Sequence, residues 1–170
     1  LRRPDFPRAR HAIARPTPKI DYRKSKSRYK VLVSGTQFGR VKADGWAGEY
    51  YLGERKKLFS FIYENGISGV IGISGDVHRS DIYKLPIGKD RYFYDFTPGS
   101  LSRTHRTPPK PLPDTMIHSY GDKTDNNMYG EIEFRPASDK KVAIIFRSIS
   151  AKNGVVYEHK LTPNDLALKP

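Results

Sequence analysis

The order of strand, helix and strand between residues 30 and 73 constrains the fold of this chain more than any other feature. Residues 30–35 form a short apolar run, residues 49–65 carry apolar side chains at helical spacing, and residues 70–73 form a second apolar run. Asn65-Gly66 is typical of a helix stop, because glycine readily adopts the left-handed conformation. A helix between two strands this close in sequence indicates parallel neighbours joined by a right-handed crossover. The sequence therefore predicts an α/β fold that contains a βαβ unit.

Two potential metal ligands follow the second of these strands. Ser74 and Gly75 are small and let the backbone bend, and Asp76 and His78 come directly after them. Aspartate offers oxygen and histidine offers nitrogen to a metal ion. In parallel sheets, ligands collect at the carboxyl ends of strands, where this turn is expected. The spacing by itself leaves two interpretations open: part of a metal site, or a polar turn in which His78 caps a neighbouring group.

The rest of the chain alternates between strand patterns and turns. Residues 81–85 and 91–96 predict an antiparallel hairpin. The polar, proline-rich stretch at 103–127 has no periodicity and predicts a long loop. Three further strands are expected before the end of the chain, at residues 129–135, 142–148 and 155–161, with Asn153-Gly154 as a hairpin turn. The second half of the fold is therefore expected to be mostly antiparallel.

Basic side chains are concentrated at the start of the chain. The formal net charge is +13, and residues 1–30 hold eleven basic and two acidic side chains, which leaves +4 for the other 140 residues. Such a proline-containing arm could bind nucleic acid or another anionic surface, or it could be a solvated lead-in. It has neither interleaved aromatic residues nor a nucleic-acid motif. We expect a lead-in or linker at 1–28, one domain at 29–165 and a tail at 166–170.

The composition excludes some classes of site. The chain has no cysteine, which excludes disulfides and cysteine-based zinc sites. No apolar run approaches the roughly 18 residues of a membrane span. Because the chain begins with Leu1, we expect it to be a processed or partial product, from which any targeting segment could be missing.

Several short sequence motifs occur in an order that is typical of one protein family. In chain order they are Asp44-Gly45-Trp46, Glu54-Arg55, Ile67-Ser68-Gly69-Val70, Ser74-Gly75-Asp76-Val77-His78, Tyr94-Asp95-Phe96-Thr97-Pro98-Gly99-Ser100-Leu101 and Tyr129-Gly130-Glu131-Ile132-Glu133. Together they resemble the C-terminal half of PhoD-like alkaline phosphatases, which belong to the calcineurin-like metallophosphoesterases. The resemblance covers residues 23–165.

The resemblance implies the C-terminal part of a four-layered α/β sandwich with metal ions at the strand ends. Asp76 and His78 match the last metal-binding motif, where the wider superfamily usually has Gly-His-x-His. It implies two or more metal ions, calcium with iron or another divalent metal, that bind a phosphate ester and activate water. Trp46 would be a pocket wall or a core residue, and Arg79 a phosphate ligand or an exposed arginine. Members of the family are often exported, which implies a periplasmic or extracellular location.

The chain departs from the family pattern because the superfamily's earlier metal-binding motifs are not found in the residues before Asp76. The string Gly121-Asp122-Lys123-Thr124-Asp125 fits one of these motifs, Gly-Asp-x-x-Asp. It follows Asp76 and no strand is expected in front of it, so we interpret it as a chance match. Two ligands cannot surround two metal ions.

Two hypotheses follow for the function. In the first, the chain is the C-terminal part of a phosphoric ester hydrolase that is inactive without its missing N-terminal half. In the second, it is a non-catalytic domain whose basic arm binds an acidic partner such as nucleic acid.

Overall fold

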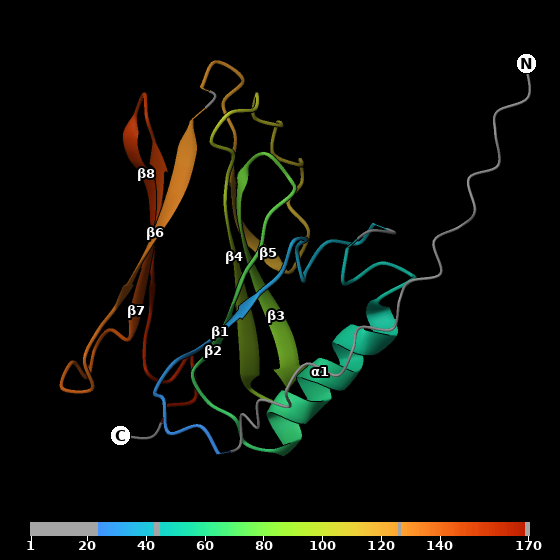
Figure 1. The fold of residues 1–170 in the computed structure, drawn as a ribbon, viewed down its shortest axis with the longest axis vertical. Coiled ribbons are helices and arrows are strands. Elements are labelled where there is room, and N and C mark those ends of the chain that lie inside the picture. Colours follow the sequence, from blue (N-terminus) through green and yellow to red (C-terminus); the bar gives the residue numbers. More distant parts are fainter. Residues whose placement is uncertain (1–23, 43–44, 126, 169–170) are drawn as a thin grey trace, which may run out of the picture.

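The computed structural model describes residues 24–42, 45–125 and 127–168 (Figure 1). These residues form one helix and eight strands: β1 Lys30–Val33, α1 Leu52–Glu64, β2 Val70–Ile73, β3 Ser80–Gly88, β4 Arg91–Pro98, β5 Met116–Tyr120, β6 Met128–Phe134, β7 Ile144–Ser150 and β8 Gly154–Leu161. The basic arm expected at 1–28 lies almost entirely outside the described residues. The described helix has 13 residues and is not long and apolar enough to cross a membrane.

The first five strands form one sheet in the order β1-β2-β4-β3-β5. β1 and β2 pair in parallel with Lys30 opposite Val70 and Val33 opposite Ile73, which confirms the parallel pairing expected for a βαβ unit. β2 also pairs in parallel with β4. β3 and β4 form the expected antiparallel hairpin. The carboxyl ends of β1, β2 and β4 therefore lie at one edge of this sheet.

The fifth strand of this sheet corrects the prediction of one long loop at 103–127. β5 pairs antiparallel with β3, Ser80 lying opposite Tyr120 and Ile82 opposite His118. Its five residues show no regular alternation of apolar and polar side chains, so the sequence pattern does not indicate a strand. Residues 116–120 form a strand because they pair with the edge of β3.

The last three strands form the second sheet in the order β6-β7-β8, which confirms the three predicted strands within a few residues. All of its pairs are antiparallel. Gly154 has φ +69°, a left-handed conformation that suits the turn between β7 and β8.

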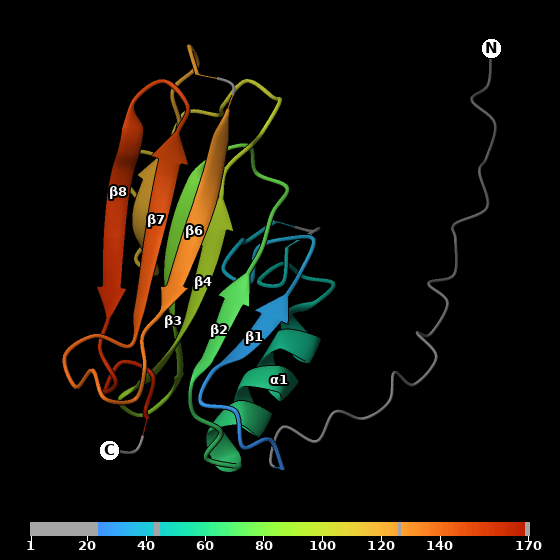
Figure 2. The ribbon, with the colours of Figure 1, turned by 60° about the vertical axis from the view of Figure 1, so that its left-hand side comes forward.

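The elements form three layers, with α1 on one side of the five-stranded sheet and the three-stranded sheet on the other (Figure 2). One apolar cluster lies between the sheets and includes Ile82, Phe96 and Phe146. Leu166 and Leu168, from the segment predicted as a tail, are buried in this cluster. A second cluster between α1 and the sheet includes Phe59 and Phe93. The described residues thus form a mixed α/β fold but not the fourth layer of the expected sandwich.

The end of α1 orients the chain toward β2. The Gly66 N–H donates to the Tyr63 carbonyl and the Ile67 N–H donates to the Ile62 carbonyl, a pairing that caps helix carbonyls. Gly66 has φ +60°, which a residue with a Cβ adopts less readily. Ile62 and Ile67 are both buried in the helix-side cluster. This capped turn confirms the predicted helix stop.

Candidate metal centre

The loop after β2 carries both predicted metal ligands at the carboxyl edge of the sheet. The Ser74 N–H donates to the Phe96 carbonyl, which holds the start of the loop against β4. Val77 is only 2% exposed and anchors the loop in the interior. On either side of it, Asp76 is exposed and His78 is partly exposed. The loop thus presents one carboxylate and one imidazole to solvent.

The backbone of this loop adopts a conformation that is uncommon for residues with a side chain. Asp76 has φ +75° and His78 has φ +53°, both in the left-handed region. Residues held in sparsely populated conformations cluster at ligand sites, although aspartate and histidine tolerate this region better than most residues. Two such residues in one three-residue turn are a structural reason to regard it as a candidate site.

Arg40 is a neighbour of the site that the sequence analysis missed. Its Nη1 lies 2.5 Å from Oδ2 of Asp76, and the two side chains are 12% and 49% exposed respectively. Arg40 belongs to the loop after β1, which meets the loop after β2 because β1 and β2 are parallel neighbours. That adjacency was the available signal, but no spacing rule selects Arg40 among the basic residues of the chain.

Arg79 has a defined partner inside the sheet. Its Nε donates to Oδ1 of Asp81 at 2.9 Å, and the two side chains are 16% and 0% exposed. The Asp81 carboxylate also accepts hydrogen bonds from Gln37 Nε2 at 2.8 Å and Ser119 Oγ at 2.6 Å. Arg79 therefore ties the end of the candidate loop to β3, and through Asp81 to β5. It is not the exposed arginine that one expectation described.

Trp46 lies on the helix side of the sheet and makes specific contacts there. Its Nε1 donates to Ser34 Oγ at 2.8 Å, and its ring stacks on Phe38 with 5.1 Å between ring centroids. It is partly buried against the cluster between α1 and the sheet. These contacts account for the packing of Trp46. Trp46 and Arg40 belong to the same segment between β1 and α1.

Two buried polar side chains near the loop each have an atom without a hydrogen-bond partner among the described residues. These atoms are Oδ1 of Asp95 and Nδ1 of His105. Burial raises the pKa of the Asp95 carboxyl group to about 6, against the opposing effect of hydrogen bonds from Ser74, Phe38 and Gly39. His105 is 2% exposed and precedes Arg106, whose N–H donates to the His78 carbonyl. Asp95 belongs to one of the motifs that resemble PhoD-like enzymes, but no sequence pattern assigned it or His105 to the site.

The Gly-Asp-x-x-Asp string follows a strand, contrary to our expectation, because β5 ends at Tyr120. β5 runs parallel to β4, so Asp122 lies at the same edge of the sheet as the candidate loop. Its carboxylate accepts hydrogen bonds from the N–H and hydroxyl of Thr124, and that of Asp125 accepts from Ser150 and the Asn127 N–H. Asp122 is thus engaged in a local turn, and Asp125 joins a local turn to Ser150 of β7.

The described residues fit only part of a metal site. Asp76 and His78 supply one oxygen and one nitrogen donor, a combination that suits transition metals. No group of three or more histidine, cysteine, aspartate or glutamate residues in the described part of the chain is arranged to hold a metal ion. Two donors alone would fill only one side of a metal site.

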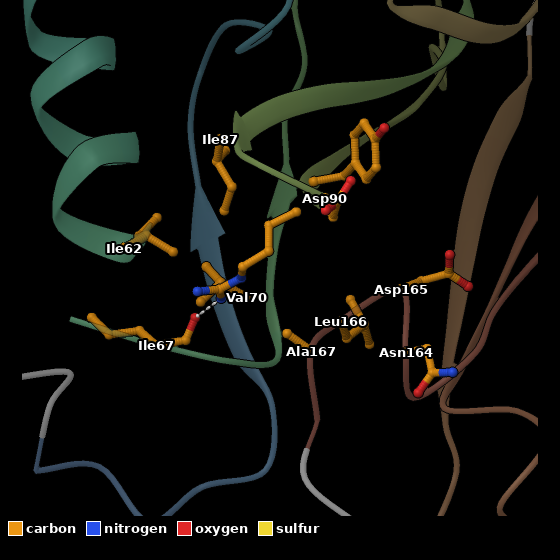
Figure 3. Close-up of a pocket in the computed structure, with 11 residues that line it drawn as sticks. Ile62, Ile67, Val70, Ile87, Asp90, Asn164, Asp165, Leu166 and Ala167 are labelled. Atoms are coloured by element: carbon orange, nitrogen blue, oxygen red, sulfur yellow. Dashed lines mark hydrogen bonds between the residues drawn. The ribbon is translucent and has the colours of Figure 1, made fainter. Parts of the chain in front are cut away.

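A small pocket lies at the opposite end of the sheet from this loop (Figure 3). Its lining includes Val70 at the start of β2, and Arg91 Nη2 donates across it to the Ile67 carbonyl at 2.7 Å. Its volume of about 10 Å³ is close to that of one water-sized sphere. This pocket is therefore too small for an organic ligand.

Comparison with known proteins gives a likeness of fold. No family model matches the chain, and no curated protein matches it. A solved structure described as GAP50, the anchor in the inner membrane complex of Plasmodium, aligns with a TM-score of 0.52 and 18% identity over 83% of this chain and 38% of that chain. A structure of PhoD aligns with a TM-score of 0.49 and 15% identity over 83% and 33%. The chain thus spans less than two-fifths of the length of these structures, and the likeness to GAP50 supports the mixed α/β fold alone.

Proposed function

We propose that this chain is part of a metal-dependent phosphoric ester hydrolase of the PhoD-like type, with Asp76 and His78 as metal ligands. The observation that carries the proposal is the loop after β2. An aspartate and a histidine there adopt left-handed backbone conformations and lie at least partly exposed at the carboxyl end of a parallel strand. Among the reactions that such a pair could support, the sequence motifs that resemble those of PhoD-like enzymes favour phosphate ester hydrolysis.

The chemistry of the proposal divides between metal ions and side chains. Two or more metal ions, calcium with iron or another divalent metal, would neutralise phosphate charge and lower the pKa of a bound water. Asp76 and His78 would hold them on one side, and ligands from the missing N-terminal half would complete the site. Arg79 would fix the loop through Asp81 instead of contacting phosphate directly. The full four-layered sandwich and export from the cell belong to the same proposal.

The fold alone does not select catalysis over binding. GAP50 is described as an anchor, and one fold commonly carries unrelated functions. The proposal therefore depends on Asp76 and His78, and it is tested at those residues.

The test measures hydrolysis of p-nitrophenyl phosphate by the full-length protein that contains this chain, with Ca²⁺ and Fe³⁺ supplied. Asp76→Ala and His78→Ala should each lower kcat/KM by at least about 100-fold, because loss of a ligand exceeds the 10–100-fold effect of residues around a metal. Asp122→Ala is the matched control and should retain most of the activity, since its carboxylate serves a local turn. Normal rates for the Asp76 and His78 variants would reject the site.

A further inference from the structure

Arg40 and Asp76 form an ion pair at the mouth of the candidate site. A guanidinium group donates to a carboxylate that would also have to bind a metal ion. Arg40 is the more buried partner, at 12% exposure against 49% for Asp76. The pair is therefore reached from solvent on the Asp76 side.

The main chain of Arg40 is held firmly in its loop. The Ala47 N–H donates to the Arg40 carbonyl at 3.2 Å, and the Trp46 N–H donates to the Gln37 carbonyl at 3.2 Å. A Cβ atom built on Gly45 would lie 2.3 Å from the Arg40 carbonyl oxygen, so these two segments are in close contact. The guanidinium group can change partners by rotation of its side chain while these backbone contacts are kept.

A metal ion and a guanidinium group on the same carboxylate repel one another. The repulsion between two positive centres a few ångströms apart is only partly screened at a partly exposed site. A phosphoryl group bound at the metal would add negative oxygens beside the same guanidinium, and arginine binds such oxygens through two parallel hydrogen bonds. Asp76 and phosphate are thus alternative partners for one side chain.

We propose that Arg40 exchanges partners: it neutralises Asp76 while no metal is bound, and it binds the phosphoryl oxygens of the substrate when the site is loaded. This inference rests on the proposed function. It assigns Arg40 two opposing effects, weaker metal binding and tighter phosphate binding. A residue with a merely structural role would, on removal, weaken both.

The first measurement is isothermal titration calorimetry of the full-length protein with Mn²⁺ alone. Arg40→Met should bind Mn²⁺ at least about threefold more tightly than wild type, because a competing positive charge is removed. Arg40→Lys keeps the charge and should change Mn²⁺ affinity less than Arg40→Met does. Arg135→Met is the matched control, since Arg135 also forms an ion pair with a carboxylate, that of Glu133 at 2.9 Å, but on the three-stranded sheet.

The second measurement is inhibition by inorganic phosphate in the presence of saturating Mn²⁺. Arg40→Met should raise the inhibition constant about tenfold, as expected for the loss of a charge-assisted hydrogen bond, and Arg135→Met should not change it. Weaker Mn²⁺ binding by Arg40→Met, or an unchanged phosphate constant, would overturn the inference while leaving the metal site intact. Mn²⁺ binding that Asp76→Ala does not reduce would overturn both this inference and the proposed function.

Discussion

The carboxyl group of Asp95 is buried between the loop after β1 and the carboxyl end of β2. Its Oδ2 accepts the Phe38 N–H at 2.7 Å, whereas its Oδ1 has no partner among the described residues. Burial disfavours the charged form and Asp81 adds repulsion, so the pKa of Asp95 is about 6 in the folded protein against an ordinary value of 3.8. This residue links protonation to the stability of the core beneath the candidate loop.

The raised pKa of Asp95 predicts a stability that falls as the pH rises. The folded state holds this proton more tightly than the unfolded state, so the contribution is complete below about pH 4 and is lost as the pH passes through 6. The raised pKa corresponds to a contribution of roughly 3 kcal/mol to the free energy of unfolding. The measurement is urea unfolding at pH 4 and pH 7. The difference in free energy of unfolding between Asp95→Asn and wild type should favour the variant more at pH 7 than at pH 4.

An aspartate with the opposite shift provides the control. Hydrogen bonds from the N–H groups of Val142 and Lys141 lower the pKa of Asp139. Its contribution is present at neutral pH and is lost as the pH falls through its folded pKa. Asp139→Asn should therefore lose stability relative to wild type at pH 7 and not at low pH. If the two variants shift in the same direction, the assignment for Asp95 is wrong.

At the scale of elements, β2 lies between β1 and β4 and carries the candidate loop, and it is closely packed at Gly72. A Cβ atom there would lie 2.8 Å from Cζ of Phe93 and 3.1 Å from the ring of Phe38. Both rings are buried between the sheet and α1. The small residue in β2 thus lets the aromatic core approach the strand closely.

This packing predicts that Gly72→Ala lowers the free energy of unfolding by about 1–3 kcal/mol, the usual cost of overpacking a core. The measurement is urea unfolding followed by the fluorescence of Trp46, which stacks on Phe38. Gly53→Ala is the matched control, because a Cβ on Gly53 in α1 has no atom within 4 Å. That control should be stabilised by up to about 1 kcal/mol through helix propensity. Equal effects of the two substitutions would contradict the close packing at β2.

At the scale of the whole molecule, the candidate loop brings two proposed metal donors to the edge of the sheet. Asp76 and His78 face the site from one loop, and no third histidine, aspartate or glutamate in the described part of the chain completes a group with them. Of the Gly-Asp-x-x-Asp string, Asp122 is bound in a local turn, and Asp125 joins a local turn to Ser150 of β7. The proposed chemistry therefore requires ligands beyond the described residues.

The small number of donors among the described residues predicts a difference between this chain alone and a longer protein that contains it. The isolated 170-residue chain should fold but show no metal-dependent hydrolysis of p-nitrophenyl phosphate above background, whereas the full-length protein should hydrolyse it. Circular dichroism of the isolated chain establishes that it is folded. Metal-dependent turnover by the isolated chain, abolished by Asp76→Ala, would show instead that its own residues complete the site.

The sequence by itself determined the elements whose signals are local. The apolar runs of β1 and β2, the helical spacing of α1 and the stop at Asn65-Gly66 depend on neighbouring residues, and so does the position of Asp76 and His78 after a strand.

Only the tertiary structure decided the rest. β5 forms because its residues pair with the edge strand position beside β3. Arg40 forms an ion pair with Asp76 because β1 and β2 are parallel neighbours. The burial of Asp81 and Asp95 likewise depends on residues distant in sequence. Such contacts depend on how the layers pack, which no local periodicity encodes.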